Sequence, residues 1–348
     1  MALTFRRSWS DPDLDQYRDT VVRFIEEHML PGDEAARHRG HVGHELWRQA
    51  GQTGLLCTDI PEQWGGAGGD FRHEAVFYEE MARRSLTGLN ASVHTIVAHY
   101  LLNHGTDAQR QRYLPRLVSG ECVGAIAMTE PGTGSDLQGI RTRAERSGAG
   151  YVINGSKTFI SNGFLAGLVL VVAKTDPTQG ARGLSMFIVD TADCPGYRVG
   201  RVLDKMGLKA QDTSELFFDD VAVGPEQLLG GREGQGFFQL MADLPYERLI
   251  IGVTALAAME GAYQARWTTC ASARPSVRAW PISRTPASSW PRSPPRSPWA
   301  APSSTAAWKT WWPAGSTPPP PPWPSSGVPK RRAGWWTPAC SCSAATAT

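Results

Sequence analysis

Apolar side chains recur with a helical period near the start of the chain. Between Asp11 and His28 they fall at Leu14, Tyr17, Val21, Phe24 and Ile25, which is the spacing of one helix face. Asp11 suits the N-cap position, and Pro12 suits the first helical position. The pattern therefore predicts an amphipathic helix that begins at residue 12.

The helical pattern continues as far as residue 120. It is visible in "HELWRQAGQTGLLC", in "EAVFYEEMARRS", and in "TDAQRQRYLPRLVSG", where Asp107 lies near a helix start. The glycine-rich turn "IPEQWGGAGGD" interrupts it. Residues 1–120 are therefore predicted to form an N-terminal α-helical domain.

From residue 121 the pattern changes to short β-rich runs between turns. These runs are "CVGAIAMTE", "GYVINGSKTFISN", "LVLVVAKT", "GLSMFIVD" and "ELFFDDVAV". They predict a small β-barrel or sandwich over 121–230. The stretch 231–265 is helical again, with apolar positions on more than one face, as in a buried helix of a bundle. The fold class is α+β multidomain, with a C-terminal bundle of which only the first helix is present.

Residues 266–348 have a composition that no packed domain shares. They hold ten of the thirteen Trp and no Asp, Glu, Leu, Phe, Tyr, Met, Asn, Gln or His. They carry ten of the 35 basic residues, so residues 1–265 have 25 basic against 33 acidic residues, a net charge of −8. We expect a disordered Pro/Trp/Ser/Ala tail, and a globular part without a nucleic-acid partner.

The tail is also consistent with a frame-shifted reading of an ordinary gene. When each codon is rebuilt from the last base of one tail codon and the first two of the next, "CSCSAATAT" admits QLFGGYGY and "RWTTCASARPSVR" admits LDYVRERPAFGQ. Two further windows give sensible sequence in the same shifted frame. The alternative is a genuine proline-rich binding or linker segment.

Other classes of function find little support in the sequence. The longest apolar runs are shorter than the roughly 20 residues of a membrane span. Cys57, Cys122 and Cys194 lack metal spacing, and the N-terminus shows no secretory pattern, so we expect a cytoplasmic protein without disulfides. His94 and His99 lack a third ligand for a metal, so we expect packing or capping roles for both and no metal site.

Two short motifs in the β-rich region carry a family resemblance. "AMTEPGTGSD" (127–136) and "KTFISNG" (157–163) resemble the signatures of the flavin-dependent acyl-CoA dehydrogenase family. The resemblance covers residues 11–265 and implies that FAD is the cofactor. It implies flavin contacts for Met128, Thr129, Gly134, Ser135, Phe159 and Ser161. Ser135 would also line the acyl-CoA passage. Glycines that let backbone N–H groups approach an anion suit such a role.

A third motif supplies a candidate base. "LPYERLIIG" resembles the helix that carries the catalytic glutamate in long-chain and isovaleryl-type members, which places Glu247 at that position. By the same resemblance, Tyr246 and Arg248 are expected beside the substrate. A carboxylate can remove the proton next to a thioester carbonyl if desolvation raises its pKa.

The resemblance implies oxidation of a fatty acyl-CoA to the trans-2-enoyl-CoA. It also implies an electron-transfer flavoprotein as acceptor and a homotetramer, the latter impaired here by loss of the C-terminal domain. Activity of this chain is therefore expected to be weak or absent. Alternatives are an acyl-CoA oxidase or related flavoprotein of the same fold, or a non-enzymatic remnant with a proline-rich binding tail. Glu247 favours dehydrogenation over monooxygenation.

Overall fold

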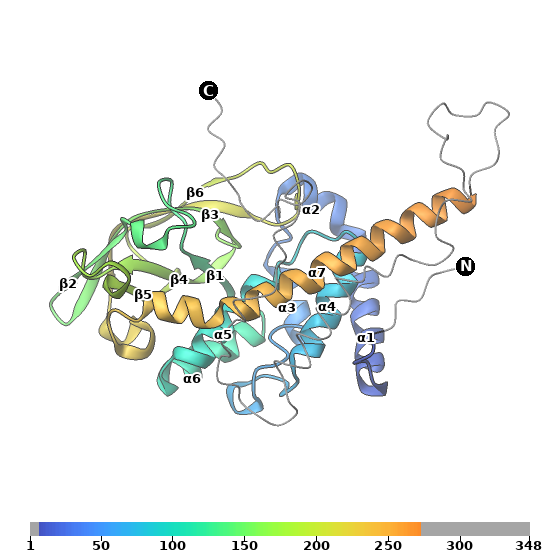
Figure 1. Cartoon of the computed structure of the whole chain (residues 1–348), viewed down its shortest axis with the longest axis horizontal. Helices are drawn as coiled ribbons and strands as arrows, with labels where there is room; N and C mark the ends of the chain where they lie inside the picture. Colours follow the sequence, from blue (N-terminus) through green and yellow to red (C-terminus); the bar gives the residue numbers. More distant parts are fainter. Residues whose placement is uncertain (1–6, 273–348) are drawn as a thin grey trace, which may run out of the picture. The chain divides into compact units, whose positions relative to one another are not determined.

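The computed structural model describes residues 7–272, with side chains to residue 269 (Figure 1). The last helix (Gly236–Ser272) continues past the predicted boundary at 265, so residues 266–272 of the predicted tail are helical, and the rest of the tail lies outside the described residues. The helices are α1 (Pro12–Phe24), α2 (Asp33–Arg39), α3 (His44–Gln52), α4 (Phe71–Arg83), α5 (Ala91–His104), α6 (Asp107–Val118) and α7 (Gly236–Ser272). A π-helical turn, Ile25–Met29, follows α1. The predicted N-terminal helical domain is confirmed, because α1 to α6 occupy it.

Local signals explain where several helices begin. The Asp11 carboxylate accepts a hydrogen bond from the Leu14 N–H at 3.0 Å, and Pro12 occupies the first turn of α1, as the sequence predicts. At α6 the cap is Thr106, whose hydroxyl accepts from Gln109 N–H while the Gln109 side chain accepts from Thr106 N–H. In each of these helices a capping side chain therefore bonds one of the N–H groups that the first turn leaves free.

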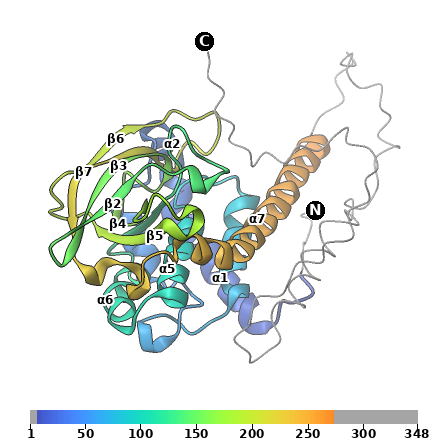
Figure 2. The same ribbon diagram turned by 60° about the vertical axis from the view of Figure 1, so that its left-hand side comes forward.

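A single sheet follows the helices. Its strands are β1 (Val123–Ala127), β2 (Arg143–Ser147), β3 (Gly150–Ser161), β4 (Ala166–Lys174), β5 (Leu184–Asp190), β6 (Tyr197–Val202) and β7 (Thr213–Val223). The order is β1-β4-β2-β3-β7-β6, and β5 pairs with β4. The sheet curls on itself (Figure 2). The β-rich middle region is thus confirmed as one curled seven-stranded sheet.

Two strands that both pair with β4 meet different helices. Strand β1 packs against α5, and β5 packs against the start of α7. Inside the sheet, large apolar side chains from four strands, including Ile153, Val171, Phe187 and Leu216, are fully buried. Helix α5 also contacts α7, so it lies against both β1 and α7.

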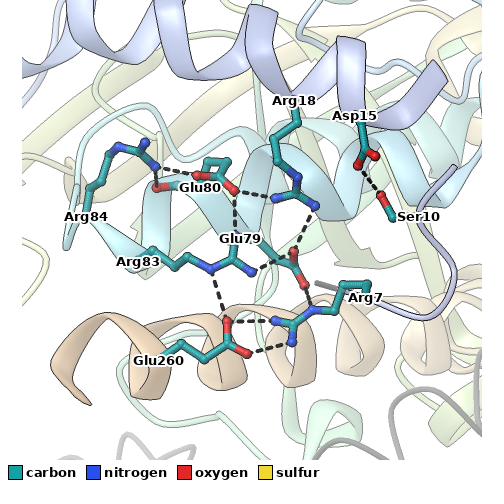
Figure 3. A network of polar contacts seen from close by, with 9 residues as sticks. All are labelled: Arg7, Ser10, Asp15, Arg18, Glu79, Glu80, Arg83, Arg84 and Glu260. Atoms are coloured by element: carbon teal, nitrogen blue, oxygen red, sulfur yellow. Dashed lines mark hydrogen bonds and ion pairs between the residues drawn. The ribbon is translucent and has the colours of Figure 1, made fainter. Parts of the chain in front are cut away.

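Helix α7 is held on α4 by a network of ion pairs. The Glu260 carboxylate of α7 accepts hydrogen bonds from both terminal nitrogens of Arg7, at 2.6 and 2.9 Å. It also accepts one from Nε of Arg83 at 3.0 Å. The arginines Arg7, Arg18, Arg83 and Arg84 surround Glu79, Glu80 and Glu260 (Figure 3). The network joins the N-terminal segment, α1, α4 and α7.

One face of α7 exposes large apolar side chains. Phe238, Met241, Ile251, Met259 and Trp267 are each between 40% and 54% exposed. The sequence predicts apolar positions on more than one face of this helix, but among the described residues only one side of it is covered. None of the described helices combines the length and apolar character that a membrane crossing requires.

Candidate functional site

The first motif forms the loop that leaves β1. Met128 and Thr129 are half-buried, whereas Gly134 and Ser135 are exposed. The loop turns between Glu130 and Thr133, which exchange both backbone hydrogen bonds, at 2.8 and 3.1 Å. A Cβ added at Gly134 would meet no atom within 4 Å. The loop tip therefore leaves open space beside its backbone.

The second motif lies at an irregularity in β3. The pairing of β3 with β7 shifts between Lys157 and Ile160, which is the signature of a β-bulge. Phe159, inside the bulge, has a φ of +60° and is 47% exposed. A large apolar ring in a left-handed conformation on the surface is unusual, and such strain marks functional positions.

The bulge brings the two motifs together. Because Thr158 does not pair with β7 at this point, its N–H donates to the Thr129 carbonyl at 2.9 Å. Three residues further on, the Ser161 hydroxyl accepts a hydrogen bond from Gln211 Nε2 at 3.1 Å. Thus the structure connects Thr129 directly to the strand that carries Phe159 and Ser161.

These residues fit a flat, partly anionic cofactor. The exposed Phe159 ring offers a surface for stacking, and the open loop at Gly134 lets backbone groups approach a phosphate. Thr129 and Ser161 supply hydroxyls that can donate to or accept from ring heteroatoms. The predicted flavin contacts therefore lie on two connected segments.

Glu247 lies on α7 opposite α5. One carboxylate oxygen accepts a hydrogen bond from the Tyr100 hydroxyl at 2.8 Å. Burial raises the pKa of Glu247; the Tyr100 hydrogen bond opposes this effect, the nearby Asp243 charge adds to it, and Arg248 opposes it. The net result is a carboxyl whose pKa lies above the ordinary glutamate value, as a general base in a desolvated site requires.

The turn of α7 that carries Glu247 is anchored to α5 through Asp243. Asp243 accepts from Asn103 Nδ2 at 2.7 Å, and it lies 2.8 Å from Nε2 of His104. Pro245, between Asp243 and Glu247, cannot donate a helical hydrogen bond. These side-chain contacts with α5 therefore support a turn that its own backbone holds less firmly.

Tyr246 and Arg248 have contrasting surroundings. The Tyr246 hydroxyl donates to Asp59 Oδ2 at 3.1 Å, and its ring stacks on His99 at 4.1 Å between centroids. Arg248 is exposed, and no hydrogen bond or ion pair engages it among residues 7–269. Of the two predicted substrate-side residues, only Arg248 therefore has its polar group free for a ligand.

The base and the flavin motifs rest on a common support. In the described part of the chain, no hydrogen bond or ion pair joins Glu247 to residues 128–135 or 157–163. Helix α5 links them indirectly, because it contacts both β1 and α7. His94 of α5 also accepts from Gly124 N–H at 3.0 Å, and its Nε2 lies 2.9 Å from the Leu117 carbonyl oxygen.

Comparisons with known proteins define the class. The family models "Acyl-CoA dehydrogenase, N-terminal domain" and "Acyl-CoA dehydrogenase, middle domain" match residues 11–121 and 125–221. The chain therefore belongs to the acyl-CoA dehydrogenase family, and the resemblance inferred from its motifs is confirmed.

Individual relatives agree with this assignment. The long-chain specific acyl-CoA dehydrogenase, mitochondrial, of Rattus norvegicus is 47% identical over 249 residues, which are 71% of this chain and 57% of the rat protein. The chain thus spans little more than half the length of that relative. A crystal structure of acyl-CoA dehydrogenase from Geobacillus kaustophilus is 37% identical, with a TM-score of 0.74, covering 77% of this chain and 71% of that one. A glutaryl-CoA dehydrogenase from Mycobacterium smegmatis in complex with FADH2 is 28% identical, with a TM-score of 0.69, covering 76% of this chain and 67% of the other.

Proposed function

We propose that this chain derives from an FAD-dependent dehydrogenase that oxidises a fatty acyl-CoA to its trans-2-enoyl-CoA. Family membership supports the reaction class. The observation that carries the mechanism is the half-buried Glu247 carboxyl, which has a raised pKa and accepts a hydrogen bond from the Tyr100 hydroxyl. The related structure with bound FADH2 supports FAD as the cofactor.

The two connected motifs would hold the cofactor. Met128, Thr129, Phe159 and Ser161 would contact the flavin ring, and Gly134 and Ser135 would line the phosphate side. FAD, when bound, supplies the acceptor for the hydride that leaves the β carbon. The protein's own contribution here is a flat, preorganised surface made by a loop and a bulged strand.

Glu247 would remove the α proton of the thioester. The C–H bond breaks, the proton passes to a carboxylate oxygen, and the electron pair forms the double bond as the hydride leaves the β carbon. The raised pKa makes the carboxylate a stronger base than one in water. Tyr100 donates to the ionised carboxylate and so keeps it oriented before the proton arrives.

The substrate and the partners are inferred from the relatives. The name of the rat relative supports a long-chain acyl-CoA, and Arg248 is expected beside it, with Tyr246 shaping the wall behind the base. An electron-transfer flavoprotein would reoxidise the cofactor, and the assembled enzyme would be a homotetramer. Rapid reoxidation by oxygen instead would identify an acyl-CoA oxidase.

We further infer that the chain as written has little activity. Before residue 266, the exposed apolar side chains of α7 extend from Phe238 to Met259, and a face of this size normally packs against other helices. The residues that would form those helices are replaced by the composition of 266–348. Restoring the shifted frame after codon 265 should therefore restore activity.

The test compares two proteins, the chain as written and the chain with the shifted frame restored. Each is reconstituted with FAD and mixed with acyl-CoA esters of increasing chain length, while enoyl-CoA formation is followed with an artificial electron acceptor. We expect turnover in the restored protein and much less in the chain as written. Absence of enoyl-CoA from a restored protein that holds FAD would refute the proposed reaction.

A further inference from the structure

A buried ion pair fastens the loop after β1 to strand β3. Lys157 Nζ lies 2.9 Å from Glu130 Oε1 and donates to the Met128 carbonyl at 3.0 Å. The Lys157 side chain is 0% exposed and that of Glu130 is 5% exposed. Glu130 and Lys157 lie inside the two motifs, but the family resemblance assigns a flavin contact to neither.

The Glu130 carboxylate joins a third segment to this pair. Its oxygens accept from the backbone N–H groups of Arg141, at 2.7 Å, and Thr142, at 2.9 Å. Burial alone would raise the pKa of Glu130, but the Lys157 charge and these hydrogen bonds outweigh burial and hold it below the ordinary value. The carboxylate therefore stays charged and connects the loop, the segment before β2, and β3.

The pair also fixes the orientation of two peptide groups. The Met128 carbonyl is bound by Lys157, and the Thr129 carbonyl is bound by the N–H of Thr158. Both carbonyls are thus directed towards β3. Since Met128 and Thr129 are the expected flavin contacts, this arrangement sets the shape of the backbone that the cofactor would meet.

Stability alone does not require an ion pair in this position. Two buried charges must give up their hydration, and apolar residues of similar volume often stabilise a core as well or better. What an apolar pair cannot do is orient the Met128 carbonyl and bind the two N–H groups at Arg141 and Thr142. The structure therefore suggests a role in geometry.

We propose that Lys157 and Glu130 are positioning residues that hold the 128–136 loop in the shape that FAD requires, without contacting FAD themselves. The proposal rests on the proposed function, because it presupposes that this loop binds a flavin. It adds two residues, both buried behind the loop, to the requirements of the site.

The experiment separates geometry from stability with three variants of the full chain. Lys157→Met leaves Glu130 as an unpaired buried charge. The double variant Lys157→Met/Glu130→Gln removes both charges and so relieves that penalty. Lys174→Met is the matched control, because Lys174 Nζ also donates to a backbone carbonyl, that of Gln138, at 3.0 Å but in an exposed position.

Three quantities are measured for each protein: the FAD dissociation constant from flavin fluorescence, the unfolding midpoint, and the amide exchange rates of residues 128–136 in the apoprotein. For Lys157→Met we expect a lower midpoint and FAD binding weakened more than tenfold. For the double variant we expect a midpoint near that of the wild type, with FAD binding still weakened more than tenfold and faster exchange in the loop. Lys174→Met should change FAD binding less than twofold.

Each contrary outcome has a distinct meaning. If the double variant regains the wild-type FAD affinity and loop exchange together with its stability, the pair is merely structural and the proposal is wrong, while the proposed function stands. If the wild-type chain and its frame-restored version both fail to bind FAD, the proposed function fails and this proposal fails with it.

Discussion

Replacing Glu74 by Gln should remove a large pH dependence of folding. Glu74 is 0% exposed, and its carboxylate accepts from Thr58 N at 2.6 Å, from the Thr58 hydroxyl at 2.9 Å and from the Tyr78 hydroxyl at 2.5 Å. No cation pairs with it among the described residues. Burial and the neighbouring Asp59 charge raise its pKa to about 7, and the hydrogen bonds oppose that shift only in part.

The magnitude and sign follow from linkage. A rise from 4.5 to about 7 corresponds to about 3 kcal/mol, at roughly 1.4 kcal/mol for each pKa unit. Between these two pH values the folded chain holds a proton that the unfolded chain releases. The stability from Glu74 is therefore fully present below pH 4.5 and is lost as the pH rises through the folded-state pKa. Gln imitates the protonated form at every pH.

The assay is urea unfolding of wild-type, Glu74→Gln and Glu34→Gln proteins from about pH 4.5 to pH 8. The difference in free energy of unfolding between Glu74→Gln and the wild type should shift by about 3 kcal/mol across this range, in favour of the variant at high pH. Glu34 is exposed on α2, so its variant should run parallel to the wild type. Parallel curves for Glu74→Gln and wild type would refute the reasoning.

Three further outcomes test the site and its scaffold. Tyr100→Phe removes the donor to Glu247 and should raise the pKa of Glu247 further, by roughly one unit for a hydrogen bond to a charged group. NMR titration of labelled glutamate carboxyls, with the Glu247 signal assigned from Glu247→Gln, would measure this shift. An unchanged titration midpoint for Glu247 would count against the contact. Glu260→Gln weakens the network that holds α7 on α4 and should cost about 3 kcal/mol in thermal unfolding, whereas a loss below about 0.5 kcal/mol would show that the network is only a surface feature. Gly51→Ala would place a Cβ 2.2 Å from the Ser119 backbone and should disrupt the packing of α3 against the end of α6. Gly252→Ala, with no atom within 4 Å of the added Cβ, should stabilise α7 by about 1 kcal/mol. A higher thermal unfolding midpoint for Gly51→Ala than for Gly252→Ala would contradict the packing.

Local signals made part of this fold predictable. The start of α1 follows from Asp11 and Pro12, and strands β4 and β5 follow from continuous runs of buried residues such as Val171 and Phe187. These features depend on neighbours within a few residues, and their patterns are strong. The confirmed succession of helices and sheet comes from such patterns.

Three of the elements that the sequence patterns did not single out show the physical reasons. Strand β2 buries only Ala144, so it lacks an apolar pattern. Strand β6 lies at the edge of the sheet and has no fully buried residue. Helix α5 is buried on most sides, and its polar residues His94 and Thr95 are bonded inside the protein, which hides any amphipathic period.

The candidate site, like the fold, was predictable from the sequence only in part. Motifs indicated Glu247, Phe159 and Thr129, because each lies in a short recognisable stretch. The contacts that support them are long-range: Tyr100 is 147 positions from Glu247, and Lys157 and Glu130, although each lies within a motif, are 27 positions apart. Tertiary packing creates these contacts, so no local pattern announces them. The roles of all these residues in binding and catalysis stay predictions.

The most direct measurement is flavin reduction by substrate in the absence of oxygen, comparing the frame-restored protein with its Glu247→Gln variant. Both should bind FAD equally, since Glu247 makes no described contact with the flavin motifs. Acyl-CoA should bleach the flavin of the frame-restored protein, and its Glu247→Gln variant should react at least about a hundredfold more slowly. Equal rates of bleaching would contradict the assignment of Glu247 as the base.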